Sequence, residues 1–263
     1  MKKLTLILLF SISTAFAQTE KYYVTFISND VILQRTGKAL KLGDAMLPSD
    51  KLIFKNKGAK ISCISPGKGR FDLNGEQVRP GAGGELLAVL KGNLVPSEKT
   101  MHLSTRSLPG SGYNPETYFV APETSDRILL IENEVLPIST SYKRDPQNFF
   151  FIQYNDNSKI VTRKIAQNDT GLIFDSSLFT GAATPQKVKI CYQSNKSGSA
   201  RSSQIAEFTP VLLSKETLSQ QVKILEAYSG IKDKKLLIAE ILTHLAANYG
   251  KIGADEIPAF LTD

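Results

Sequence analysis

The chain has 263 residues, of which 41% are apolar and 22% are charged, with 32 lysines and arginines against 25 aspartates and glutamates and no tryptophan. This composition is typical of a globular chain with more than one compact unit, and it excludes a disordered or collagen-like chain. Its two cysteines are too few for the disulfide framework of a small secreted domain, so apolar cores must stabilise the fold.

Residues 1–17 have the pattern of a secretory signal peptide. Two lysines precede a run over 4–10 that is apolar except for Thr5, and Ala15 and Ala17 form the small-x-small pattern that a signal peptidase cleaves. Gln18 stands where a lipoprotein would carry a cysteine, which indicates release without a lipid anchor. We therefore expect cleavage near Ala17, a periplasmic or secreted product, and no transmembrane segment in the mature chain.

Residues 18–96 are predicted to form a small β-domain, either a barrel or a sandwich. Short apolar or alternating runs are separated by turn residues such as Asn29-Asp30 and Asn74-Gly75. The expected strands are 22–27, 31–34, 52–54, 59–64 and 70–73. Residues 85–90 are predicted as a short helix or an edge strand.

Residues 97–117 lose this periodicity and collect Ser, Thr, Pro and Gly, as in a linker or long surface loop. Residues 118–210 return to short β-runs and predict an immunoglobulin-like β-sandwich. The expected strands are 118–120, 127–131, 135–138, 149–154, 159–165, 172–174, 188–192 and 205–208. The run 149–152 is apolar on both faces, so it indicates either a central strand covered on both sides or an edge strand turned toward another domain.

The two cysteines have different predicted surroundings. Cys63 shares a strand face with Ala59 and Ile61, so it is expected to be buried. Cys191 falls on the polar face of its strand, beside Lys189. Three explanations stay open: the thiol faces another domain or chain, the register is shifted by one residue, or the thiol pairs with Cys63.

Residues 211–263 change to a period of 3.6, which predicts a C-terminal α-helical hairpin in an otherwise mainly β chain. Ser214 and Asp233 are the expected N-caps, and Gly230 and Gly250 follow the two helices. The apolar stripes consist of Leu218, Val222 and Leu225, and of Leu237, Ile241 and Leu245. Since two helices cannot bury these stripes alone, we expect them to pack within the chain or on a partner.

The positive charge is concentrated in residues 18–96, which hold 12 basic and 7 acidic residues. Six neighbouring cations form the candidate binding site for an anionic partner: Lys51, Lys55, Lys57, Lys60, Lys68 and Arg70. If 51–57 is a strand, its three lysines share a face with Ile53. Such a patch binds anionic polymers or headgroups, whereas lysines on exposed strands also block edge-to-edge aggregation. Because the chain is expected to be exported, we predict no nucleic-acid partner.

No catalytic or metal-binding signature is found. His102 and His244 are the only histidines, and the sequence has no HExxH, CxxC, EF-hand or P-loop motif. We therefore predict no cofactor, no metal and no catalytic residues. His244 is expected to be a surface or packing residue of the second helix. Glu132 and Glu134 are expected to share a solvated strand face.

Part of the basic domain resembles a known family. The motif residues are Gly37, Leu40, Gly43-Asp44, Leu47, Asp50 and Leu52, followed by Gly69-Arg70-Phe71. With them, residues 31–73 resemble the β-domain of FecR-like proteins and of exported Bacteroidota-type proteins of unknown function. The resemblance implies a β-fold and brings no catalytic residues.

Together these observations predict a non-enzymatic exported protein of the cell envelope that acts as an adaptor or structural component. Its expected partner is another envelope protein. The alternative is a binding module for an anionic glycan, peptidoglycan or lipid surface that uses the basic β-domain. A second alternative is a hydrolase with an unrecognised site.

Overall fold

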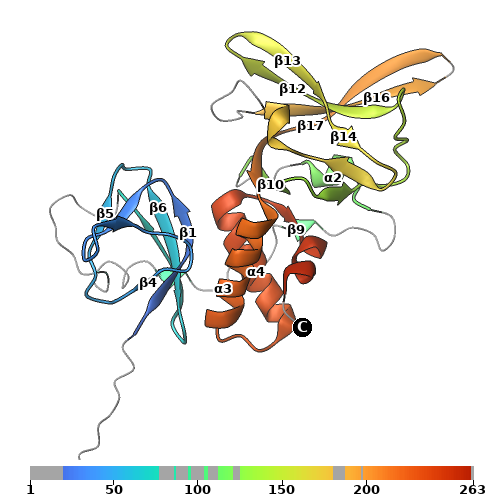
Figure 1. Cartoon of the computed structure of the whole chain (residues 1–263). Coiled ribbons are helices and arrows are strands. Elements are labelled where there is room, and N and C mark those ends of the chain that lie inside the picture. Colours follow the sequence, from blue (N-terminus) through green and yellow to red (C-terminus); the bar gives the residue numbers. More distant parts are fainter. Residues whose placement is uncertain are drawn as a thin grey trace, which may run out of the picture.

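The computed structural model describes residues 20–76, 86, 94–95, 104–105, 112–120, 125–179, 187–196 and 198–261. Two β-domains lie on different sides of a pair of helices (Figure 1). The predicted fold class, mainly β with a C-terminal helical hairpin, is confirmed. The signal peptide at 1–17, most of 85–90 and most of the 97–117 linker, with His102, lie outside the described residues.

The N-terminal β-domain consists of two sheets around one core. One sheet has the order β4-β1-β6-β7-β8 and the other the order β3-β2-β5. Within the described residues neither sheet closes on itself, so the domain is a sandwich rather than a barrel. Its strands are β1 (Tyr22–Ser28), β2 (Val31–Leu33), β3 (Lys38–Ala39), β4 (Ala45–Met46), β5 (Leu52–Phe54), β6 (Lys60–Ser65), β7 (Gly69–Asn74) and β8 (Leu94–Val95).

Both faces of the larger sheet in this domain are covered. Ile61, Cys63 and Phe71 point into the core shared with the smaller sheet. Side chains alternate along a strand, so Ile64 and Arg70 lie on the opposite face, and both are buried as well. The second face is covered because the C-terminal helices pack on it. Cys63 is fully buried, as predicted, and its thiol is free.

The second β-domain is also a sandwich. A five-stranded sheet with the order β10-β17-β16-β12-β13 and a three-stranded sheet with the order β11-β15-β14 enclose one core. Pairing is antiparallel except between β10 and β17, which run parallel. The strands are β10 (Arg127–Ile131), β11 (Val135–Pro137), β12 (Phe149–Asp156), β13 (Lys159–Lys164), β14 (Ala166–Gln167), β15 (Gly171–Ile173), β16 (Val188–Lys196) and β17 (Ser199–Leu213). A 3-10 turn, η2 (Ser176–Phe179), follows β15.

The prediction of a strand at 118–120 is wrong. The chain instead forms a short helix, α2 (Pro115–Tyr118), because the Asn114 side chain accepts a hydrogen bond from the Glu116 backbone N–H and proline occupies the first helical position. The sandwich also extends past the expected boundary at residue 210, since β17 runs on to Leu213.

Strand β12 lies inside the five-stranded sheet, between β16 and β13. Phe150 and Ile152 fill the sandwich core, whereas Phe151 is buried on the outer face. Cys191 pairs with Phe151 across the strands, so an aromatic neighbour shields its thiol, which is free and buried. The central-strand alternative is thus confirmed, and a disulfide between the two cysteines is not formed.

The helical hairpin consists of α3 (Lys215–Tyr228) and α4 (Lys234–Tyr249). The two predicted N-caps are observed, since Ser214 accepts from the Thr217 N–H and Asp233 from the Leu236 N–H. Gly250 ends α4 with a φ of 109°, and a Cβ at this position would collide with the Arg127 carbonyl of β10. All six predicted stripe residues are buried. The hairpin therefore packs within the chain.

After α4 the chain forms β18 (Ile252–Gly253) and a 3-10 helix, η3 (Ala254–Phe260). Strand β18 pairs in parallel with β9 (Ser104–Thr105), which belongs to the predicted linker. Tyr113, near the end of the same segment, is buried in the sandwich core. The described parts of the linker are thus tied into the fold.

Candidate functional site

Three of the six predicted cations are exposed. Lys51, Lys55 and Lys57 lie on and beside β5, and within the described chain none of them forms an ion pair. Strand β5 ends at Phe54, so it does not align the three lysines along one strand face as predicted. Ile53, in its middle, is 44% exposed. These three lysines keep a free charged surface beside an apolar side chain.

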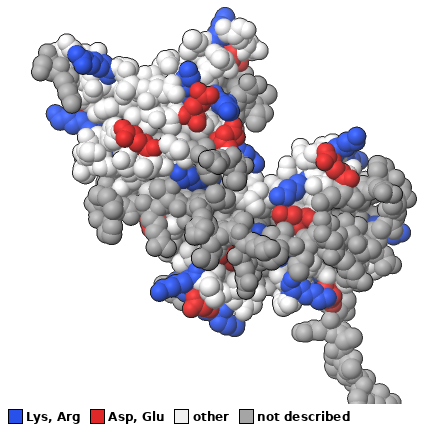
Figure 2. All heavy atoms as spheres, turned by 180° about the vertical axis from the view of Figure 1, so that it is seen from behind, with Lys and Arg blue, Asp and Glu red and all other residues white. Residues whose placement is uncertain are grey.

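The other three cations are engaged within the protein. Lys60 pairs with Asp72 at 3.6 Å, and Lys68 pairs with Glu20 at 2.6 Å. Arg70 is only 2% exposed and cannot meet a partner from solution, which corrects its assignment to the basic patch. On the face turned away from Figure 1, basic and acidic residues alternate over the described surface without a single-sign patch (Figure 2).

Arg70 instead belongs to a buried polar cluster between β7 and α4. Its Nη1 lies 3.2 Å from Oε1 of Glu240, which is 6% exposed. Arg70 Nε and Glu240 Oε2 have no hydrogen-bond partner within the described residues. Burial raises the pKa of Glu240, while the Arg70 guanidinium opposes this shift. Both charged groups are shielded from water and incompletely hydrogen-bonded. Removing either side chain would therefore leave the charge of the other buried without a partner.

The cluster continues along α4 through His244 and Asn248. The Asn248 side-chain amide donates to the His244 carbonyl at 3.0 Å, and its oxygen accepts from the Ser62 hydroxyl of β6 at 3.2 Å. The same hydroxyl lies 2.5 Å from Oδ1 of Asp72 in β7, so the two acceptors share its single proton. His244 is fully buried, which confirms the packing alternative, and burial lowers its pKa to about 3. The imidazole is therefore neutral at pH 7.

This interface cluster of Arg70, Glu240, His244, Asn248, Ser62 and Asp72 was missed by the sequence analysis. Glu240, His244 and Asn248 follow one another at intervals of four residues, so they form a polar stripe beside the apolar one. This spacing of polar residues along α4 is the feature of the sequence that could have revealed the cluster. Its contacts join the β-domain to α4, so its chemistry is that of a buried interface.

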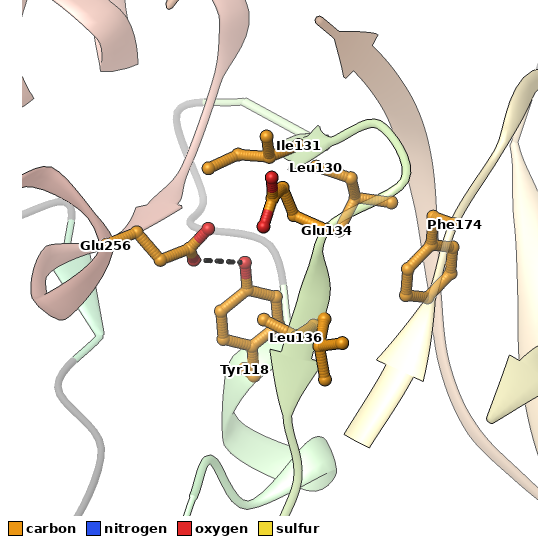
Figure 3. Close-up of a pocket in the computed structure, with 8 residues that line it drawn as sticks. Tyr118, Leu130, Ile131, Glu134, Leu136, Phe174 and Glu256 are labelled. Atoms are coloured by element: carbon orange, nitrogen blue, oxygen red, sulfur yellow. Dashed lines mark hydrogen bonds between the residues drawn. The ribbon is translucent and has the colours of Figure 1, made fainter. Parts of the chain in front are cut away.

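A second polar group, which is half-buried, lies where η3 meets the sandwich (Figure 3). The Glu256 carboxylate points toward Tyr118 and accepts a hydrogen bond from its hydroxyl at 3.2 Å. Burial raises the pKa of Glu256 to about 7, although the bonds from Tyr118 and from the Gly253 N–H act in the opposite direction. Gly253 is required here because a Cβ would collide with the Tyr113 hydroxyl and the Glu256 carboxylate.

The void beside Glu256 is small. About 10 Å³ is open to the centre of a water-sized sphere, so the void holds at most one water molecule. Leu130, Ile131 and Leu136 line it together with Glu134, whose carboxylate pairs with Lys215 at 2.7 Å. Glu134 lies in the turn after β10 and not within a strand, which corrects the predicted Glu132–Glu134 strand face. This Glu256 pocket has no room for a substrate.

Lys251 fixes α2 on the other side of Tyr118. Its Nζ donates to the carbonyls of Thr117 at 2.7 Å and Val120 at 2.9 Å, at the C-terminal end of the short helix. Burial lowers the pKa of Lys251 to about 8. Lys251 and Glu256 thus anchor the end of the chain to α2 through one titratable side chain each.

Replacing Glu256 with glutamine is expected to stabilise the protein above pH 7 by about 1–3 kcal/mol and to have little effect below pH 4.5. In the native protein the pKa of this carboxyl is raised from 4.5 to about 7. Between pH 4.5 and 7 the unfolded chain therefore releases this proton more readily than the folded chain, so the free energy of unfolding falls as pH rises. The amide keeps the size of the side chain without the charge. Urea unfolding at pH 4.5, 6 and 8 measures the difference.

The matched control is Glu207→Gln, which removes a carboxylate from an exposed position on β17. This control should leave the pH dependence of unfolding unchanged. A gain for Glu256→Gln that is the same at all three pH values would show that the carboxyl is not neutral in the folded protein.

The described residues contain no cluster of three or more His, Cys, Asp or Glu side chains able to hold a metal ion. Within the same residues no helix is long and apolar enough to cross a membrane. No family model matches this chain, and no match to a curated protein or to a solved structure is found. The function must therefore be argued from the structure alone.

Proposed function

We propose that this protein is a non-enzymatic, exported component of the cell envelope that acts as an adaptor. The main support for this proposal is an apolar core shared by the N-terminal β-domain, the helical hairpin and the second β-domain. Ile64 of β6, Leu129 and Ile131 of β10, Leu225 of α3 and Ile241 of α4 belong to one cluster of buried apolar residues. The helices thus bury their apolar faces between the two β-domains.

Aromatic contacts reinforce the same arrangement. Tyr23 of β1 stacks on Tyr228 of α3 with ring centroids 3.6 Å apart, and Phe26 meets Tyr249 of α4 edge to face at 5.1 Å. Aromatic pairs of this kind add to the free energy of packing. The N-terminal β-domain is therefore fixed to the helices, and the helices to the sandwich. An adaptor needs this property, since it must present two surfaces at a constant distance.

The test is crosslinking followed by affinity purification of the tagged mature protein from its own envelope, with mass spectrometry of what is recovered. We expect a protein partner in amounts comparable to the chain, and a complex that forms again from the two purified proteins. Recovery of glycan or lipid, without any protein in amounts comparable to the chain, would contradict the proposed adaptor function. Deleting residues 18–96 is unsuitable here, because it would expose α4.

A second candidate function is binding to an anionic glycan, peptidoglycan or lipid surface. The exposed charges of Lys51, Lys55 and Lys57 favour it, because cations free of internal ion pairs are available to anions. The triple change of these lysines to glutamate should abolish sedimentation with such polymers at low salt if this function is correct. The same variant should keep its protein partner if the adaptor is correct and uses another surface.

A further inference from the structure

Strand β13 is an edge strand with an open side. In the order β10-β17-β16-β12-β13 it pairs with β12 alone, and no other described strand pairs with it. Edge strands present unpaired N–H and C=O groups to which a further strand can add. Figure 1 shows the β12–β13 hairpin extending from the sandwich on the side away from the helices.

The turn of this hairpin defines its hydrogen-bond pattern. Asn157 and Ser158 have φ values of 48° and 70°, so they form a two-residue turn of the kind that joins antiparallel strands. The residues that flank such a turn, Asp156 and Lys159, are paired and bond to each other. Backbone groups alternate in direction along the strand, so every second residue after Lys159 points away from β12.

The open edge therefore consists of the backbone groups of Ile160, Thr162 and Lys164. The next bond along the hairpin agrees with this alternation, since Ile165 N donates to Phe150 O at 3.0 Å. The side chains of the three edge residues lie on the outer face of the sheet, and Ile160 is 73% exposed. A strand added here would meet, in a fixed register, donors and acceptors that no described strand engages.

The charge of this edge is uniformly positive. Lys159, Arg163 and Lys164 are exposed, and within the described chain none of them forms an ion pair. The sequence of β13 contains no acid. Opposite charges on neighbouring strands stabilise their pairing, and like charges destabilise it. An added strand with carboxylates is therefore favoured over one with cations.

A groove of about 380 Å³ lies beside the start of β13 on the same sheet. The groove is lined by Ile160 together with the amides of Gln153 and Asn155 and with Lys189 and Glu207. The groove lies over β12, β16 and β17, with Ile160 at its rim, and its charged lining groups are Lys187, Lys189 and the Glu207 carboxylate. The unpaired backbone and the positive charge of β13 thus point to one type of occupant.

We propose that β13 binds an extended acidic segment of a partner protein, which adds as a further strand to its open edge. The inference rests on the adaptor function, because it names the chemistry of the adaptor's partner. A second copy of this chain is disfavoured as occupant, since two β13 strands would bring the cations of both copies into one seam without a carboxylate.

Fluorescence anisotropy with labelled peptides tests the proposal on the full mature protein. The probe alternates glutamate and valine. One control peptide has the same sequence with alternate backbone nitrogens methylated, and another replaces glutamate with lysine. Methylation keeps the charge and the side chains but removes N–H donors. We expect the first peptide to bind about tenfold more tightly than either control, as the loss of one or two hydrogen bonds implies.

On the protein, Thr162→Pro removes an N–H at the open edge without removing a bond to β12. Thr162→Ala is the matched control, since both changes lose the side-chain bond from Gln153, which is 3.1 Å long. We expect about tenfold weaker binding for the proline variant and little change for alanine. Thermal unfolding and circular dichroism verify that both variants fold.

Equal binding of the methylated peptide, or equal effects of proline and alanine, would overturn strand addition in favour of simple charge attraction. Binding of the lysine peptide as tightly as the glutamate peptide would overturn the acidic preference. If neither acidic peptide binds while an envelope partner is still captured, this inference fails and the adaptor function stands. If neither peptide nor partner binds, both fail.

Discussion

Replacing Glu240 with alanine is expected to lower the free energy of unfolding by about 3–5 kcal/mol. The change leaves the Arg70 guanidinium charged and buried, at 2% exposure, without its carboxylate. The main cost is this uncompensated charge, because the mutual attraction of a buried pair only offsets the loss of its hydration. Urea unfolding of the wild type and of the variant at pH 7 measures the effect.

Two controls separate this cost from the loss of an ordinary ion pair. Glu134→Ala breaks the exposed pair with Lys215 and should cost less than about 1 kcal/mol. The double change Arg70→Met with Glu240→Leu removes both charges and should recover most of the stability that Glu240→Ala loses. If Glu240→Ala costs no more than Glu134→Ala, the pair is solvated and the interface cluster is not buried.

Burial of Arg70 also explains why the sequence analysis placed it on the surface. Along β6 and β7 the polar residues Ser62, Arg70 and Asp72 alternate with apolar ones, which is the usual pattern of a strand with one solvated face. Alternation identifies the two faces but does not say what lies on the second. That face is covered by α4, whose Glu240 lies 170 residues after Arg70 in the chain. The pairing is a tertiary contact that local periodicity does not contain.

The sequence was, in contrast, sufficient to predict those features that depend only on neighbouring residues. Both helices begin at the predicted caps, because an N-cap side chain bonds within its own turn. Strands 52–54 and 127–131 also end where predicted. Tyr118 was misassigned for the opposite reason: its aromatic neighbours resembled a strand, while the decisive signal was the Asn114-Pro115 pair just before it.

The candidate site was predictable only in part. Lysine clustering identified an exposed charged segment at Lys51, Lys55 and Lys57, but sequence distance alone could not exclude partners for the other three cations. The open edge of β13 could not be recognised, because edge position depends on the order of strands in the sheet. The strand itself, 159–165, was predicted almost completely.

Acidification from pH 6.5 to pH 4 is expected to destabilise the protein through His244. Burial, with Arg70 contributing in the same direction and Asp72 opposing it, lowers the pKa of this imidazole from 6.5 to about 3. Below pH 6.5 the unfolded chain binds a proton that the folded chain does not, so stability falls by up to about 1.4 kcal/mol per pH unit. The loss continues until pH approaches 3, where the folded state is protonated too.

Glu256 acts in the opposite direction between pH 4.5 and 7, because its raised pKa lets the folded chain hold a proton that the unfolded chain has released. The wild type should therefore show a shallow pH dependence in this window. His244→Gln should become more stable on acidification and Glu256→Gln less stable, while the slope of the double variant should lie between those of the two single variants. Unfolding free energies of all four proteins from pH 4 to 7 measure these slopes, and parallel curves for the wild type and His244→Gln would show that the buried imidazole is not held neutral.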